Sequence, residues 1–201
     1  MAGQVCKVYI VRGFREAGYA LSKEEREAKL AQVAAARHEC GGRLLVSAVA
    51  RWSGYEIYGF GAEVFPDLES LQKHTAALEK LDWYRYIDSV SFIGTPLIIE
   101  EPIYEAPIYQ LQLIHGMREA GYALAEERLN DGFKQVFTSV DKQGMRRLLR
   151  MDCRWSNEDY KLIQVFEWPS LEAQMKHTAF EELVEWPRLV NQRHILGVKA
   201  P

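Results

Sequence analysis

The sequence predicts an α+β fold built from two copies of one unit, joined head to tail in a single chain. Two observations carry this prediction. The heptapeptide REAGYAL occurs at residues 15–21 and again at residues 118–124, 103 positions later. Each copy also shows strand-like and helix-like segments in the order strand, helix, strand, strand, helix, strand.

The repeat extends well beyond the heptapeptide. The same offset carries Arg51-Trp52-Ser53 onto residues 154–156, and it carries Lys73-His74-Thr75-Ala76 onto residues 176–179. A constant offset without insertions indicates a tandem duplication. The segment EEPIYEAP between the copies has two prolines and no periodicity, which is typical of a stiff linker. We therefore expect a first repeat at 1–99, a linker at 100–107 and a second repeat at 108–201.

The elements of each copy follow from local signals. The first strand alternates through VCKVYIVRG, and Gly18 suits the tight turn that comes after it. Ser22 and Glu25 form a capping-box pattern at the start of the first helix, which ends at a glycine pair. Asp67 and Ser170 are suitable N-caps for the second helix of each copy.

The second strand of each copy has two unlike faces. In copy two the apolar face ends at Trp155, and Trp52 holds the matching position in copy one. Alternation places both tryptophans toward the helices, in the core. The other face carries Arg150, Asp152 and Arg154, which would then meet the second sheet. Charges buried there must pair with one another or with a ligand, so an ion-pair network and a polar pocket both remain open.

A βαββαβ order makes a four-stranded antiparallel sheet with both helices on one side, the ferredoxin-like arrangement. The opposite face of each sheet is left bare. Packing the two bare faces together covers both of them. The predicted architecture is therefore two ferredoxin-like repeats forming a single-chain pseudo-dimeric α+β barrel.

With this element order the chain resembles the dimeric α+β barrel superfamily, which includes stress-responsive α/β barrel, antibiotic-biosynthesis monooxygenase, polyketide cyclase and YCII-like proteins. SLQKHTA at residues 70–76, and its copy at 174–179, look like the stress-responsive helix that carries a His-Pro-x-His pair. The first histidine matches His74 and His177. Ala77 and Phe180 stand where the second, catalytic histidine of that family lies, so its mechanism does not carry over.

Composition excludes several classes. The net charge of −3 and the pI near 6.0 leave no basic stripe for nucleic acid. No apolar run approaches the roughly 20 residues of a membrane span, and the first residues resemble a strand rather than a signal peptide. The three cysteines, at positions 6, 40 and 153, are far apart and contain no CxxC pair. We therefore expect a cytoplasmic protein without a disulfide framework.

Four histidines are candidate site residues. His177 and His74 lie at the edge of their helices' apolar stripes, where an imidazole can act as a general base or pack as a buried structural group. Copy two carries His115 where copy one has arginine, and His194 where copy one has serine. Copy two is therefore the more polar. A site that combines His177 with His115 could form only there.

The loop REAGYAL offers another set of candidates. Its Arg118 and Tyr122 could bind an anionic ligand or close a lid over a pocket, and they could equally pack the loop onto the helix ends. The segment lacks the glycine run of a phosphate loop. No histidine spacing matches a metal motif, so we expect neither a metal nor a cofactor.

Two functions remain open. The first is a protein that binds a small organic ligand, as a cofactor-independent oxygenase, cyclase or isomerase acting on an aromatic or apolar substrate. Trp155, the charged strand and the histidines would line its pocket. The second is a non-catalytic interaction protein of the same fold. Further homo-oligomerisation is compatible with both.

Overall fold

The computed structural model describes residues 3–53, 56–124 and 126–200, except for the side chains of residues 126, 129, 133 and 137. The elements of the first half are β1 (Val5–Phe14), α1 (Glu16–Tyr19), α2 (Lys23–Glu39), β2 (Arg43–Val49), β3 (Gly59–Phe65), α3 (Leu68–Lys80), α4 (Trp83–Tyr86) and β4 (Ile87–Ile99). Those of the second half are β5 (Ile108–Met117), α5 (Glu119–Tyr122), α6 (Glu126–Lys142), β6 (Arg146–Asp152), β7 (Leu162–Trp168), α7 (Leu171–Leu183), α8 (Trp186–Leu189) and β8 (Val190–Lys199).

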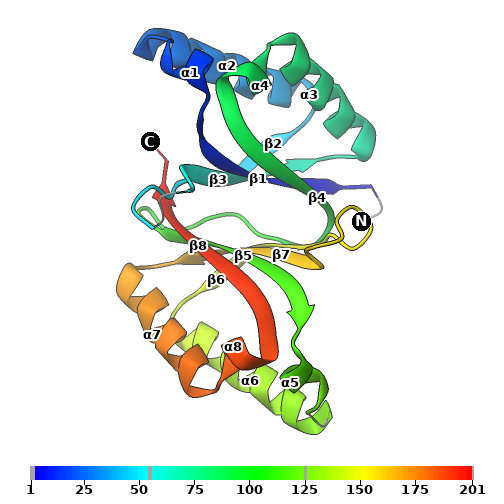
Figure 1. Ribbon diagram of the computed structural model, residues 1–201, viewed down its shortest axis with the longest axis vertical. Helices are drawn as coiled ribbons and strands as arrows, with labels where there is room; N and C mark the ends of the chain where they lie inside the picture. Colours follow the sequence, from blue (N-terminus) through cyan, green and yellow to red (C-terminus); the bar gives the residue numbers. More distant parts are fainter. Residues whose placement is uncertain (1–2, 54–55, 125, 201) are drawn as a thin grey trace.

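The strands form one closed antiparallel barrel in the order β1-β3-β2-β8-β5-β7-β6-β4. Two seams join the halves. At one seam β4 pairs with β6, and at the other β2 pairs with β8 through Ala48↔Lys199 and Val49↔Val198. Figure 1 shows the two groups of strands facing each other in the centre, with α1–α4 on one outer side and α5–α8 on the other. The predicted α+β class is confirmed.

The helices begin where the sequence predicts. Ser22 and Glu25 form both hydrogen bonds of a capping box at the start of α2. The Asp67 side chain accepts from Ser70 N at the start of α3, and the Ser170 side chain accepts from Ala173 N at the start of α7. These caps set the position of α3 and α7, and therefore of the two histidines that the helices carry.

The main core fills the barrel interior between the two sheets. Apolar side chains from every strand meet there, among them Val8, Val46, Phe60, Phe92, Leu111, Met151, Val165 and Ile195. This core reverses the predicted facing of the second strand. Leu149, Met151 and Cys153 point into the barrel, whereas Arg150 points toward the helices. The reason is physical: the barrel interior is enclosed by both halves, so the wholly apolar face is the one buried there.

The prediction that Trp52 and Trp155 lie in the core is wrong. They are 48% and 54% exposed. The strands β2 and β6 end at Val49 and Asp152, and the tryptophans stand in the turns that follow. Because a turn does not continue the strand's alternation, the period-two pattern could not place these side chains. Trp155 Nε1 donates to Thr95 Oγ1 at the seam between the halves.

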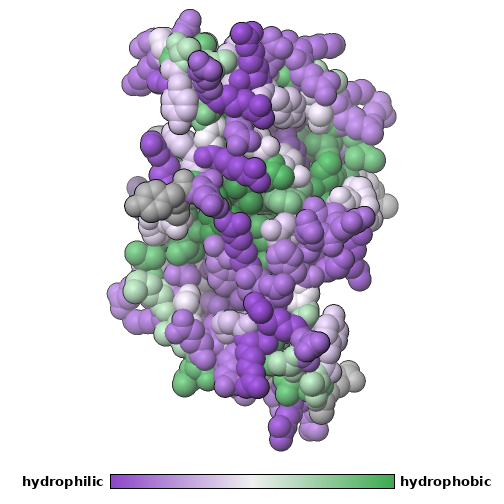
Figure 2. Space-filling model, in the orientation of Figure 1, coloured by the Kyte–Doolittle hydropathy of each residue, from purple (hydrophilic) through white to green (hydrophobic). Residues whose placement is uncertain are grey.

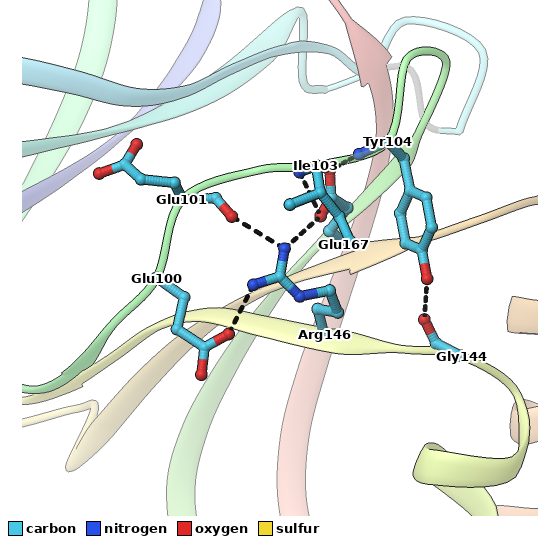
Figure 3. A network of polar contacts seen from close by, with 7 residues as sticks. All are labelled: Glu100, Glu101, Ile103, Tyr104, Gly144, Arg146 and Glu167. Atoms are coloured by element: carbon cyan, nitrogen blue, oxygen red, sulfur yellow. Dashed lines mark hydrogen bonds and ion pairs between the residues drawn. The ribbon is translucent and has the colours of Figure 1, made fainter.

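A polar network ties the segment between β4 and β5 to the barrel, as Figure 3 shows. Glu167 of β7 is fully buried and accepts hydrogen bonds from the backbone amides of Ile103 and Tyr104. Arg146 approaches the same carboxylate at 3.6 Å and also bonds Glu100. The connecting segment is therefore held along its length.

Hydrophilic residues cover most of the face drawn in Figure 2, and hydrophobic residues gather in its central part, over the barrel strands. The outer surfaces of the helices at both ends are mainly hydrophilic there. Within residues 3–53, 56–124 and 126–200, no helix has the length and apolar character needed to cross a membrane.

Candidate functional site

The second half has a partly open cavity of ≈ 260 Å³ between its strands and its helices. Strands β5, β6, β7 and β8 form the floor, and α6, α7 and α8 contribute the opposite wall. The lining is mainly apolar, with residues such as Ile114, Met117, Val136, Val140, Met145, Leu162, Phe166, Trp168, Trp186 and Val190. Polar groups interrupt it at a few positions. A mostly apolar cavity with a few converging polar groups is the usual form of a small-molecule site.

A row of amides crosses the cavity floor. Gln112 stands opposite Gln164 on β7 and opposite His194 on β8, so the three side chains share one face. Gln164 Nε2 donates to Gln112 Oε1 at 2.7 Å, and Gln112 Nε2 donates to Gln192 Oε1 and to His194 Nε2. His194 is therefore an acceptor at Nε2. Burial lowers its pKa, the Glu181 carboxylate raises it and His177 lowers it, so His194 is neutral near pH 7.

His177 and Glu181 form a buried pair on α7. They are one helical turn apart, and His177 Nε2 lies 3.4 Å from Glu181 Oε1. The His177 ring packs on Trp168, with 5.1 Å between ring centroids. Both side chains of the pair line the cavity, and His177 Nδ1 is buried without a hydrogen-bond partner among the described residues. Nδ1 is therefore the ring nitrogen of His177 that is left to hydrogen-bond a molecule in the cavity.

Two arginines of β6 also line the cavity. The Arg147 guanidinium lies over the Phe166 ring, 5.5 Å from its centroid. Burial and then the positive charge of Arg150 lower the pKa of Arg147. Arg150 Nε is buried and has no hydrogen-bond partner among the described residues. The cavity wall thus holds two cations side by side.

The first half is packed differently at the corresponding positions. At the offset of 103, Tyr9 stands in place of Gln112 and Gly61 in place of Gln164. Tyr9 lies so close over Gly61 that a Cβ on that glycine would overlap the Tyr9 hydroxyl. Nearby, the buried Glu63 carboxylate binds Arg37 at 3.0 Å and Lys7 at 3.4 Å.

His74 is the first-half counterpart of His177, and its surroundings differ. It is fully buried, packs on Phe65, and neither ring nitrogen has a hydrogen-bond partner among the described residues. Leu78 takes the place of Glu181 one turn later. Burial lowers the pKa of His74 to about 4. The two histidines therefore share a sequence motif and not a chemical environment.

His115 does not join His177. Along β5 the even-numbered residues face the helices, whereas Leu111 and Leu113 face the barrel core, so His115 is on the barrel side. Its Nδ1 lies 3.0 Å from Asp159 O, and its ring packs on Tyr160 at 4.3 Å. This is beside a second hollow of ≈ 500 Å³, which is lined by both halves and includes Tyr160. The predicted pairing of His177 with His115 is wrong, and His194 is the second histidine near His177.

The remaining candidates lie away from the cavity. Asp152 and Arg154 form a surface ion pair, with Arg154 72% exposed. Arg118 Nε donates to Val190 O, and Tyr122 is 76% exposed. Arg118 thus ties this loop to the start of β8, and Tyr122 does not pack over the helix ends. Of the ten candidates, His177, Arg150 and His194 are brought together.

Sequence reasoning missed several residues of the cavity. They are Gln110, Gln112, Gln164, Arg147 and Glu181. A signal was present, because each differs in type from its counterpart 103 positions earlier: Lys7, Tyr9, Gly61, Leu44 and Leu78. Among the described residues, no group of three or more His, Cys, Asp or Glu side chains is placed to hold a metal ion.

No family model matches the chain, and no curated relative matches it. Solved structures do match. A double mutant of chlorite dismutase from Candidatus Nitrospira defluvii has a TM-score of 0.74 at 16% identity, covering 98% of this chain and 92% of that chain. An arginine-to-alanine mutant of that enzyme gives 0.76 at 14%, covering 100% and 93%. Its complex with imidazole gives 0.74 at 14% with the same coverage. At these identities the likeness shows the fold alone, which is a ferredoxin-like α+β fold.

Proposed function

We propose that this protein binds a small organic molecule in the cavity of its second half and that His177 exchanges a proton with it. The observation that supports this most strongly is the contrast between the halves. The second half has a cavity of ≈ 260 Å³ beside a buried His177–Glu181 pair, whereas in the first half Tyr9 packs on Gly61 at the positions of Gln112 and Gln164. A polar pair next to unfilled apolar space is costly for folding, which favours a role in binding.

The proposed chemistry needs the chain's own residues. In this proposal His177 Nε2 faces Glu181 Oε1 at 3.4 Å, and Nδ1, which has no hydrogen-bond partner among the described residues, takes a proton from the bound molecule. The Glu181 carboxylate, 3.4 Å from Nε2, and the Trp168 ring hold the imidazole at the cavity wall. The mainly apolar walls suit a largely apolar molecule. This set of groups suits a cofactor-independent oxygenase, cyclase or isomerase with a largely apolar substrate.

The division of the chain forms part of the proposal. We propose a tandem duplication with units at 1–99 and 108–201 and a linker at 100–107, folded as a single-chain pseudo-dimer. The shared order of elements and the constant offset of the repeat support it. In this proposal the first half is the scaffold that closes the barrel, and the second half carries the site.

Haem is the prosthetic group that a chlorite dismutase-like fold implies. The described residues do not fit it. The cavity of ≈ 260 Å³ is below the roughly 300–1,000 Å³ of ordinary small-molecule sites, and a porphyrin needs more than a drug-sized ligand. The ring of His177 is also held between Trp168 and Glu181. We therefore assign no haem to this cavity.

The test compares the two histidines. The full chain and its His177→Ala and His74→Ala variants are purified in parallel, and each is analysed by native mass spectrometry for a co-purified molecule. We expect His177→Ala to lose the molecule and His74→Ala to retain it with a lower melting temperature. Equal loss from both variants would mean two equivalent sites. Retention by both, with the folds intact, would refute a role for His177.

A further inference from the structure

Resting on the function proposed above, we infer that the ligand carries a neutral hydroxyl group, which binds between Gln164 and Arg150 on the cavity floor. Two buried atoms carry this inference. Among the residues that the structure describes, Gln164 Oε1 is an acceptor without a hydrogen-bond partner, and Arg150 Nε is a donor without one. Both side chains line the cavity.

The acceptor of Gln164 is left over because its donor group is already engaged. The residue is 7% exposed, and its Nε2 donates to Gln112 Oε1 at 2.7 Å. Gln112 donates in turn to Gln192 and His194, so the amide row runs in one direction and ends at Gln164 Oε1. A buried carbonyl oxygen without a partner is costly, and a hydrogen bond from a bound molecule removes that cost.

Arg150 supplies the matching donor. It stands directly opposite Gln164 on the neighbouring strand, which places their Cβ atoms about 5 Å apart on the same face of the sheet. A hydroxyl group has one donor and two acceptor lone pairs, so a single hydroxyl can donate to Gln164 Oε1 and accept from Arg150 Nε. A carboxylate has no proton for Gln164, and an ammonium group has no lone pair for Arg150.

The first half shows a related arrangement made by the chain itself. The counterparts of Arg150 and Gln164 are Ser47 and Gly61, which also stand opposite each other. The hydroxyl of Tyr9 lies directly over Gly61, so a phenol group of the protein packs on this surface. The second half has Gln112 in place of Tyr9 and a cavity beside the two unpaired atoms. In our inference the ligand brings the hydroxyl there.

The walls define the rest of the ligand. Leu162 and Phe166 precede and follow Gln164 by two residues on β7, so they share its face, and both line the cavity. An aromatic ring can lie against them while its hydroxyl reaches the floor. The volume of ≈ 260 Å³ limits the ligand to a small molecule. Phenol is a suitable probe, and toluene has nearly the same shape without the hydroxyl.

The experiment titrates the full chain with phenol and with toluene and follows the backbone amide resonances by NMR, which also shows whether each variant is folded. The variants are Gln164→Leu, Arg150→Met and, as a matched control, Gln72→Leu on the exposed face of α3 in the first half. We expect Gln164→Leu to weaken phenol binding about 5-fold or more, as for the loss of a net hydrogen bond, without weakening toluene binding. Arg150→Met should act in the same direction, and Gln72→Leu should change neither affinity.

The outcomes separate the inference from the function on which it rests. If both probes bind and a folded Gln164→Leu variant keeps its phenol affinity, or loses phenol and toluene affinity equally, the hydroxyl inference is wrong and the cavity remains a binding site. If Gln164→Leu does not fold, the same comparison on Arg150→Met decides. Binding of neither probe to the folded, unmodified protein would contradict the proposed function itself.

Discussion

Lowering the pH should destabilise this protein through His74 more than through an exposed histidine. His74 is fully buried, and burial lowers its pKa from 6.5 to about 4. The unfolded chain therefore takes up the proton more readily than the folded protein. The stabilising contribution is fully present above the unfolded pKa and is lost as the pH falls from 6.5 toward 4. Since one pKa unit corresponds to about 1.36 kcal/mol, the full contribution is about 3 kcal/mol.

The assay is urea unfolding of the full chain at about pH 7 and about pH 4.5, compared with His74→Leu. Other groups titrate over this range in both proteins, so the comparison isolates His74. Between these two pH values the unmodified protein should lose about 2 kcal/mol more free energy of unfolding than the variant. An equal loss in both proteins would show that His74 is protonated in the folded state, and the argument from burial would fail.

Four further results are expected. Gln112→Tyr combined with Gln164→Gly should fill the cavity as Tyr9 does in the first half, and should abolish ligand retention in native mass spectrometry without unfolding the protein. Asp152→Ala should lower the free energy of unfolding by less than about 1 kcal/mol, because its partner is mostly exposed. Glu167→Gln should cost about 2 kcal/mol in urea unfolding, because a buried carboxylate loses its charge. Haemin titration should give no saturable Soret band that depends on His177.

The order of elements could be predicted from sequence because its signals are local. Capping residues act within one turn, and strand alternation acts within one strand. The side of the sheet on which a strand face lies is a different question. It depends on which surface the other half covers, and that is a contact between residues far apart in the sequence. This is why Arg150 was predicted on the wrong side while its strand was correctly placed.

The candidate site was harder to predict for a related reason. Histidines are candidate bases by residue type, so the sequence favours a pairing of His115 with His177. In the structure His177 lies on the helix-facing side of β5, whereas the His115 side chain lies on its barrel side. The glutamines of the floor have no such chemical signature. Gln112 belongs to the site because Gln164 and His194 stand opposite it on the neighbouring strands. The register between strands cannot be predicted from composition.

The two halves of the barrel use their helix-facing surfaces differently. Closing the barrel requires apolar inner faces from both halves, so neither half can change there without cost to the other. The outer, helix-facing surfaces are independent, because each is covered by its own helices. The second half can therefore have a cavity with polar groups where the first half packs Tyr9 on Gly61, without any change in the barrel core that both halves share. At this surface of the first half, the buried Glu63 carboxylate binds Lys7 and Arg37. At the same surface of the second half, Gln164 donates to Gln112 beside the cavity.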